Sequence, residues 1–517
     1  MMATNPQDRY DVVVVGGGTA GAIVAARLSE DPELSVCLIE AGPSDVGFDD
    51  VLQLRRWLSL LEGPIDLAYT TTLQPRGNAH IVHSRAAVLG GCSSHNTQIY
   101  FKPFPGDWQD WVDRGAAGWE PDGMEQYYDR LETKHQIVAE KDRNPLLLDW
   151  IPSAAKAAGV QANPDWNAAP FHDGVGFLDV GYDPATGVRS SSSVAYLHPI
   201  MGKRPNLTVL TETWVHRVNL EGGRAVSVDT DAGTIQAEHE IVVAGGSVDT
   251  PRLLLLSGIG PADDLRELGI DVQHDLAGVG ENLIDHPESI IIWELNRPLP
   301  PEGAMDADCA LFVNRLDRDF RPDLMYHTYQ LPFTFNTERL GYPVPEHCIC
   351  MTPNIPRSKS VGRMWLLSKD PAIKPALDFR YFTDEENYDE QTIVDGLKIA
   401  REVANTEPFK GWLKREIAPG PKITSDADLS TYGRAVHHTV YHPSGTCRMG
   451  AETDELAVVD PTLRVRGIEG LSIADGSIFP TMPTVNPMVA TFMIGEKAAD
   501  LVRERNGFRA HQAVAGD

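Results

Sequence analysis

Long apolar segments are missing from this chain of 517 residues. No run approaches the roughly 18–20 apolar residues of a transmembrane helix. The opening MMATNPQDRYD contains no apolar stretch long enough for a signal peptide. We therefore expect a cytoplasmic protein without a membrane partner. The length exceeds what one hydrophobic core usually supports, so we expect two domains.

Cysteine is scarce. The two nearest cysteines form a C-x-C pair that has no second ligand pair in the sequence. We expect no disulfide and no metal site, and we interpret all six cysteines as free thiols: Cys37, Cys92, Cys309, Cys348, Cys350 and Cys447.

Basic residues are few in comparison with acidic ones. Lysine and arginine number 45 against 73 aspartates and glutamates, a net charge of −28. Such a surface repels phosphate backbones and anionic membranes, which argues against a nucleic-acid partner. The same field attracts small cations, although solubility alone explains the charge equally well.

The segment from Tyr10 to Gly42 predicts a strand, a tight turn, a helix and a second strand. The turn carries Gly16-x-Gly18-x-x-Gly21, a spacing that allows backbone to approach a pyrophosphate and helix to pack closely on strand. Glu40 ends the second strand, where a carboxylate accepts hydrogen bonds from a ribose diol. These residues fit NAD, NADP or FAD, although Glu40 disfavours a 2′-phosphate.

Later segments change character several times. A helix-rich stretch around 108–132 precedes short alternating strands at 206–248, and a helix is expected from Asp249 to Leu256. Residues 288–378 favour a mixed sheet, covered by an amphipathic helix within 383–406. The last part returns to strand, loop and helix, so the two domains are expected to be interleaved.

Seven motifs in a fixed order make the chain similar to the glucose–methanol–choline (GMC) flavoproteins, and most of all to their choline oxidases. The motifs are RAAVLGGCSSHN at 85–96, RSSSSVAYLHP at 189–199, GGSVDTPRLLLLSGIGP at 245–261, GVGENLIDHPE at 278–288, YHPSGTCRMG at 441–450, ADGSIFP at 474–480 and TVNPMVATFMIGE at 484–496.

This resemblance implies a Rossmann-like α/β domain that binds FAD, interleaved with a substrate domain of mixed or antiparallel sheet and helices. We expect 1–153, 200–287 and 440–510 in the first domain, 154–199 and 288–439 in the second, and a tail at 511–517. It also implies a covalent flavin link through His95 and further cofactor contacts from Gly91, Ser94, Asn96, Val215, Asp475 and Gly476.

The family's catalytic positions fall on His442, Asn486 and His327. Histidine suits the role of a base because it accepts a hydroxyl proton near neutral pH. An amide at Asn486 orients the substrate oxygen without competing for that proton. His327 matches a second histidine that orients the same oxygen.

The resemblance also implies a cation site. Glu288 matches a glutamate that faces a trimethylammonium group, and a substrate cation would balance its buried charge. Ala307 stands where choline oxidases have a tryptophan, so one aromatic wall is missing and the pocket is expected to be larger. The remaining substrate positions are Trp57, Tyr441, Thr97 and Val440. An internal salt bridge for Glu288, and a core role for the two aromatics, stay open.

The expected activity is oxidation of a primary alcohol, choline or a related amino alcohol, with O2 reduced to H2O2. Three alternatives stay open: an oxidase of uncharged alcohols, an FAD dehydrogenase with another electron acceptor, and a lyase that uses the flavin structurally. Size and symmetry favour a homodimer.

Overall fold

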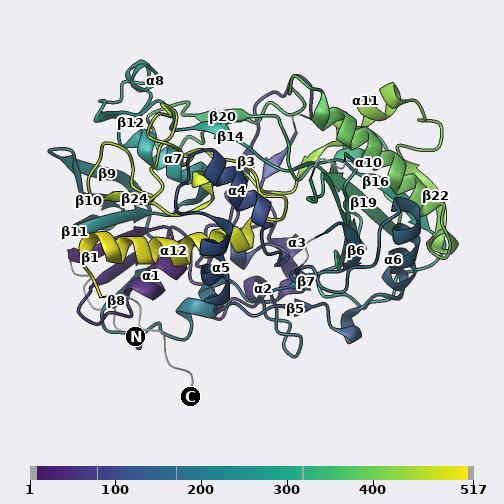
Figure 1. Ribbon diagram of the computed structural model, residues 1–517, viewed down its shortest axis with the longest axis horizontal. Coiled ribbons are helices and arrows are strands. Elements are labelled where there is room, and N and C mark those ends of the chain that lie inside the picture. Colours follow the sequence, from purple (N-terminus) through teal and green to yellow (C-terminus); the bar gives the residue numbers. More distant parts are fainter. Residues whose placement is uncertain (1–7, 79, 170–171, 317–318, 510–517) are drawn as a thin grey trace.

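A parallel sheet forms one side of the molecule (Figure 1, left). The computed structural model describes residues 8–78, 80–169, 172–316 and 319–509, so the expected tail at 511–517 lies outside it. The apolar run before the first glycines forms β1 (Arg9–Val15), followed by α1 (Gly21–Leu28) and β2 (Val36–Ile39). The predicted βαβ unit is confirmed, and the α1 helix is buried along its whole length because it packs against β1, β2 and α12.

The strand order of this sheet is β8-β2-β1-β11-β10-β9, and β24 pairs with β11. The pairs among β8, β2, β1, β11 and β24 are parallel, whereas β9 and β10 form an antiparallel extension. The added strands are β8 (Leu207–Leu210), β9 (Val215–Glu221), β10 (Arg224–Thr230), β11 (Gly233–Val243) and β24 (Leu471–Ile473).

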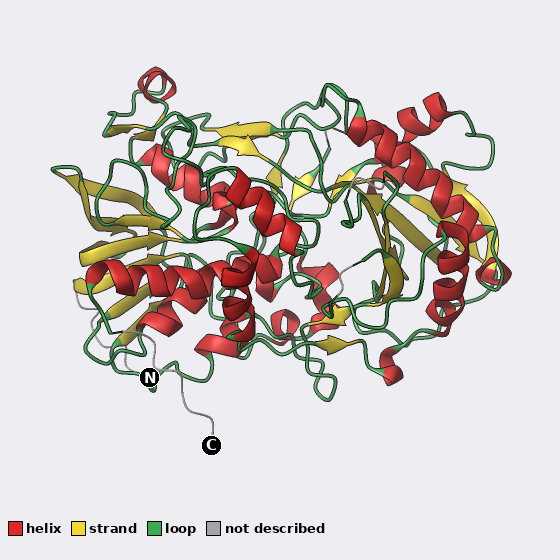
Figure 2. Ribbon diagram, in the orientation of Figure 1, coloured by secondary structure: helices red, strands yellow, loops and turns green. Residues whose placement is uncertain are grey.

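A second, antiparallel sheet lies on the other side of the molecule (Figures 1 and 2). Its main order is β22-β16-β19-β18-β17-β6, with β15 and β23 joined at one side. The strands are β6 (Gly174–Phe177), β15 (Pro287–Glu288), β16 (Ile291–Leu295), β17 (Cys309–Val313), β18 (Leu324–Tyr329), β19 (Cys348–Asn354), β22 (Leu413–Ala418) and β23 (His438–Thr439).

The amphipathic segment predicted as a cover forms α10 (Tyr388–Ala404), which packs on β19, α6 (Pro145–Ala158) and α11 (Asp426–Val436). The other helices are α2 (Asp49–Leu52), α3 (Trp57–Leu60), α4 (Pro105–Asp113), α5 (Pro121–Asp129), α7 (Gly246–Leu256), α8 (Ala262–Glu267), α9 (Phe335–Arg339) and α12 (Met488–Asn506). Within the described residues, each helix is too short or too polar to serve as a membrane span.

The remaining strands form small sheets of two or three short strands. They are β3 (Tyr69–Thr70) with β4 (Val82–His83), β5 (Gln136–Ile137) with β7 (Asp179–Val180), β12 (Ile259–Gly260) with β13 (His274–Asp275), and β14 (Glu281–Leu283) with β20 (Gly362–Trp365) and β21 (Ala376–Asp378).

The mixed α/β class is confirmed, with a largely parallel sheet and a separate antiparallel sheet. The residue boundaries of the two domains stay a prediction. Two features bear on them: α6 runs through the expected boundary at 153, and β14 shares a sheet with β20 and β21 across the expected boundary at 287.

Candidate active site

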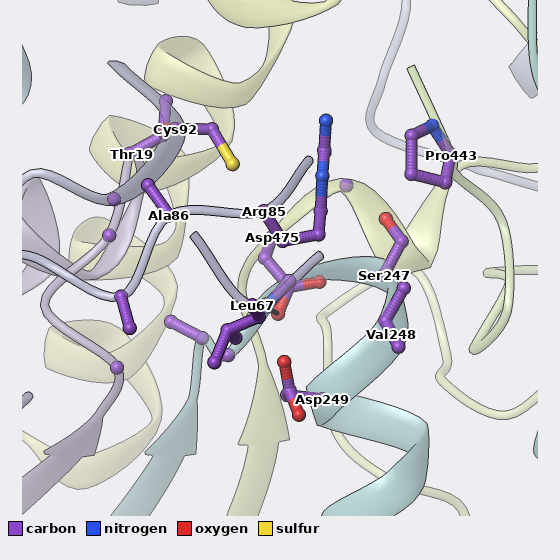
Figure 3. A pocket seen from close by; sticks show the side chains of 18 of the residues that line it. Thr19, Leu67, Arg85, Ala86, Cys92, Ser247, Val248, Asp249, Pro443 and Asp475 are labelled. Atoms are coloured by element: carbon purple, nitrogen blue, oxygen red, sulfur yellow. Dashed lines mark hydrogen bonds between the residues drawn. The ribbon is translucent and has the colours of Figure 1, made fainter. Parts of the chain in front are cut away.

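A cavity of about 650 Å³ runs from the carboxyl ends of the parallel strands toward the antiparallel sheet. Its walls come from segments far apart in sequence. Figure 3 shows Cys92, Asp249 and Asp475 around this space, carried by three separate stretches of chain. The cavity therefore joins the glycine-rich turn to the predicted catalytic residues.

The glycine turn borders one part of the cavity. Gly16 has φ +104°, and a Cβ there would lie 2.4 Å from the Ala244 carbonyl oxygen. A Cβ on Gly21 would lie 2.0 Å from the Gly16 oxygen, so helix and turn are in direct backbone contact. A Cβ on Gly18 would meet nothing closer than 3.8 Å. Its backbone therefore faces open space that a diphosphate can approach.

Glu40 lies beside this turn. Its carboxylate accepts hydrogen bonds from the amides of Gly17 (2.9 Å) and Gly42 (2.8 Å), and it lines the cavity. Burial raises the pKa of the carboxyl to about 7. Both carboxylate oxygens are held in place, so the group is pre-oriented to accept from a diol. Val215 also lines this part of the cavity.

The Asp475 carboxylate connects two chain segments at the border of the cavity. Its carboxylate accepts from the amides of Ser477 and Gly246, both at 2.8 Å, and from the Thr250 hydroxyl at 2.5 Å. It thereby ties the short 3-10 turn at Gly476–Ile478 to the start of α7, and both segments border the cavity. The sequence predicted α7 from Asp249, whereas it begins at Gly246.

His95 sits in the loop after Gly91 and lines the cavity. Its Nδ1 lies 3.2 Å from the Cys92 carbonyl oxygen and donates to it, which leaves the lone pair on Nε2. That Nε2 is buried and has no hydrogen-bond partner among the described residues. Burial lowers the pKa of the ring to about 4, so the ring is neutral at physiological pH.

Not all of the residues near His95 that were predicted to contact the cofactor line the cavity. Gly91 and Asn96 line the cavity, whereas Ser94 is fully buried outside its lining. The Ser94 hydroxyl donates to the Leu89 carbonyl at 2.8 Å, so it shapes the loop rather than facing the cavity.

His442 also faces the cavity, and its ring is held from behind. His286 Nε2 donates to the Pro483 carbonyl at 2.9 Å, so its Nδ1 carries a lone pair. His442 Nδ1 lies 2.9 Å from that atom and must donate to it. The lone pair of His442 is therefore on Nε2. Burial, with smaller contributions from the neighbouring histidines, keeps the pKa of His442 well below its usual value.

A second carboxylate supports the same segment. Asp285 accepts from the His442 backbone amide at 3.0 Å and from the Tyr381 hydroxyl at 2.6 Å. Burial raises the pKa of Asp285 to about 6. These contacts fix the backbone of the catalytic loop to the start of β15.

Asn486 and His327 line the same cavity. Asn354 Nδ2 approaches His327 Nδ1 at 3.5 Å, a long contact that favours a proton on His327 Nε2. The Asn486 amide lies near the His327 ring, and neither His327 Nε2 nor the Asn486 side-chain oxygen has a hydrogen-bond partner among the described residues. The site thus combines a proton acceptor on His442 with hydrogen-bond donors on His327 and Asn486.

The substrate-side wall contains Trp57, Tyr441, Thr97 and Val440, as the resemblance implies. Glu288 and Ala307 are absent from the described lining of this cavity, and both are 1% exposed. Tyr329 is part of the wall and was missed by the sequence analysis.

Glu288 lies one layer behind the wall, in a small second pocket with Phe333 and His438. Its carboxyl interacts with the Thr352 hydroxyl, and Oε2 has no partner among the described residues. Burial raises the pKa of Glu288 to about 8. The sequence left open an internal salt bridge for Glu288. Among the described residues, no ion pair includes Glu288, so the structure gives this alternative no support.

The sequence analysis also missed His286, Asp285, Tyr381 and Arg85. Arg85 lines the cavity, and its guanidinium donates to the Tyr441 and Ser84 carbonyls. Arg85, Asp285 and His286 lie within the quoted motifs, but nothing in the sequence singled them out from the other motif residues. Their roles depend on partners up to 356 residues away.

Comparisons with known proteins show which family the chain resembles over its length. Two family models described as GMC oxidoreductase match residues 10–288 and 356–495. Choline oxidase from Arthrobacter globiformis is 42% identical, covering 99% of this chain and 97% of the relative. Oxygen-dependent choline dehydrogenase 1 from Chromohalobacter salexigens is 33% identical, covering 96% and 95%. The crystal structure of pyridoxine 4-oxidase from Mesorbium loti has a TM-score of 0.89 at 27% identity, covering 97% of this chain and 100% of that one.

Proposed function

The chain belongs to the GMC oxidoreductase family, and on that premise we propose that it oxidises a primary amino alcohol and passes the electrons to O2, releasing H2O2. As a family member it is an FAD-dependent alcohol oxidoreductase. The observation that carries the proposal is the lone pair of His442 Nε2, directed by His286, in a cavity that also contains the glycine turn.

Two features of the cavity fit FAD. Gly18 presents open backbone beside Glu40, as a diphosphate and a ribose require. His95 Nε2 is buried and unpartnered, and it is the ring nitrogen that carries a lone pair. Our proposal therefore includes a covalent bond from His95 Nε2 to the flavin. Bound FAD supplies the acceptor for the hydride that leaves the alcohol carbon.

Residues of the chain then remove the hydroxyl proton, hold the substrate oxygen and exclude water. His442 Nε2 takes the proton of the substrate hydroxyl, since its other nitrogen is already engaged with His286. His327 and Asn486 donate hydrogen bonds to the oxygen and so stabilise the negative charge that develops there. The aromatic rings of Trp57 and Tyr441 exclude water and offer faces to a cation.

Glu288 supports an amino alcohol as substrate through its charge. It lies behind Tyr329 and Tyr441, and its negative charge raises the pKa of both tyrosines in addition to the effect of burial. A substrate cation held against these two rings would favour ionisation of the Glu288 carboxyl and be attracted by the carboxylate without touching it.

An oxidase of uncharged alcohols is the second candidate. It is favoured by the position of Glu288 and Ala307 outside the described cavity lining. The solved structure of similar fold, pyridoxine 4-oxidase, is named for a substrate with a ring.

The test is H2O2 release by the purified yellow protein with choline, other amino alcohols and neutral alcohols of equal length. Release with amino alcohols at the highest kcat/KM supports the proposal. Higher kcat/KM with the neutral alcohols selects the second candidate, and flavin bleaching without H2O2 identifies a dehydrogenase.

A further inference from the structure

We infer that Tyr329 is a specificity residue that selects substrates whose ammonium group carries an N–H, in preference to fully methylated ones. The inference rests on the proposed function, because it concerns the part of the cavity that receives the amino group.

Tyr329 is the last residue of β18 and contributes an aromatic wall to the cavity. Its ring stacks on Phe333, with centroids 4.8 Å apart and planes inclined by 14°. It also lies 6.3 Å from the Trp57 ring and 6.3 Å from the His327 ring. The side chain is therefore fixed by packing between a substrate-wall residue and a catalytic one.

Tyr329 supplies an aromatic wall from the strand next to the segment that carries Ala307. The antiparallel register pairs Ala310 with His327, and the Gln330 amide donates to the Asp306 carbonyl at 2.8 Å. The segment around Ala307 therefore runs beside the end of β18. Tyr329 lines the cavity, whereas Ala307 lies outside its described lining.

This wall differs chemically from an indole face that has no hydroxyl. The Tyr329 hydroxyl makes no hydrogen bond with the described residues, and it is not sealed from the cavity. The same is true of the Tyr441 hydroxyl, and the charge of Glu288 acts on both phenols. Two hydroxyl oxygens can thus accept hydrogen bonds close to the Glu288 carboxyl, whose pKa burial raises to about 8.

A quaternary ammonium group has no N–H and cannot use these acceptors. A protonated tertiary, secondary or primary amine donates one or more N–H groups to them, and a hydrogen bond to a charged group is among the stronger ones in proteins. The pocket therefore gains selectivity for an incompletely methylated ammonium without losing its aromatic faces.

Binding of two inert ions tests this inference independently of catalysis. Trimethylammonium carries an N–H where tetramethylammonium carries a fourth methyl group, and isothermal titration calorimetry with the holoenzyme gives their affinities. We expect trimethylammonium to bind more tightly to the wild type. Tyr329→Phe, which keeps the ring, should weaken trimethylammonium by about tenfold and leave tetramethylammonium within about twofold.

Tyr432→Phe is the matched control, because its hydroxyl donates to the Ile290 carbonyl at 2.8 Å, away from the cavity lining. It should leave the ratio of the two affinities unchanged. The ratio of kcat/KM for 2-(dimethylamino)ethanol over choline should fall by about tenfold in Tyr329→Phe only.

Equal weakening of both ions by Tyr329→Phe, no weakening of either, or failure of both ions to bind the wild type would overturn the inference. If the ions bind as expected but no alcohol reduces the flavin, the proposed function fails and the assignment of the ammonium pocket stands.

Discussion

Replacing His286 tests whether the tautomer of His442 is set by the structure. In His286→Leu the acceptor at Nδ1 disappears, and the His442 Nδ1–H that lies 2.9 Å from it loses its partner in a buried site. An unsatisfied buried donor costs about 1–3 kcal/mol, and His442 recovers part of this only by moving its proton to Nε2. That tautomer cannot act as the base. Since about 1.4 kcal/mol corresponds to a factor of ten, the limiting rate of flavin reduction should fall roughly 5–150-fold.

The assay is anaerobic stopped-flow reduction of the bound flavin by a saturating alcohol. His286→Asn serves as the control, because its side-chain oxygen can occupy the place of Nδ1 and accept from His442. It should retain a rate within about fivefold of the wild type, while substrate affinity changes little in either variant. Equal loss of rate in the leucine and asparagine variants, with unchanged melting temperatures, would refute the tautomer argument.

Three other predictions concern the covalent link to the cofactor, the charge of Glu288 and the packing around Ala307. Acid precipitation should leave the yellow colour in the protein pellet, whereas His95→Ala should release it to the supernatant; colour in the wild-type supernatant would contradict the covalent link. Because burial raises the pKa of Glu288 to about 8, its carboxylate forms as the pH rises, so kcat/KM for choline relative to 3,3-dimethylbutan-1-ol should increase through about pH 8 and level off roughly one pH unit higher. Glu288→Gln should abolish this rise and weaken choline binding more than binding of the neutral alcohol; a rise that persists would exclude Glu288 as its source. Ala307→Trp should lower the melting temperature, because Ala307 is 1% exposed and a tryptophan would overpack its surroundings; an unchanged melting temperature would show that the site has room for an indole.

The nucleotide end of the cavity could be predicted because its signal is local. A positive φ at Gly16, close backbone contact at Gly21 and a strand-ending Glu40 all fall within one βαβ unit. The fold class and the FAD cofactor followed from several long motifs in order, and both are confirmed.

Features that depend on distant contacts could not be predicted in the same way. The start of α7 moved to Gly246 because Asp475, 229 residues away, accepts from that amide. Helix α6 continues through Pro152, a residue that usually marks a boundary, because the helix packs against α10.

Some features of the candidate site also depend on distant contacts and could not be predicted from the sequence. The pairing of His286 with His442 joins residues 156 positions apart, and a histidine in a motif gives no sign of which nitrogen carries the proton. Counting along the chain placed Ala307 at a missing wall, whereas Ala307 lies outside the described cavity lining and Tyr329 of β18 lies within it. Which side chains reach the cavity depends on how the strands pair, and the sequence alone does not give that pairing.

The central claim is that His442 removes the hydroxyl proton while the bound flavin accepts the hydride. Its most direct test is anaerobic mixing of wild type and His442→Ala with 2-(dimethylamino)ethanol, followed by admission of O2. The account predicts rapid bleaching of the wild-type flavin, one H2O2 for each reduced flavin on reoxidation, and a reduction rate about 10²–10⁴-fold lower in the variant. A wild-type flavin that stays oxidised with every alcohol, or equal rates in the two proteins, would contradict it.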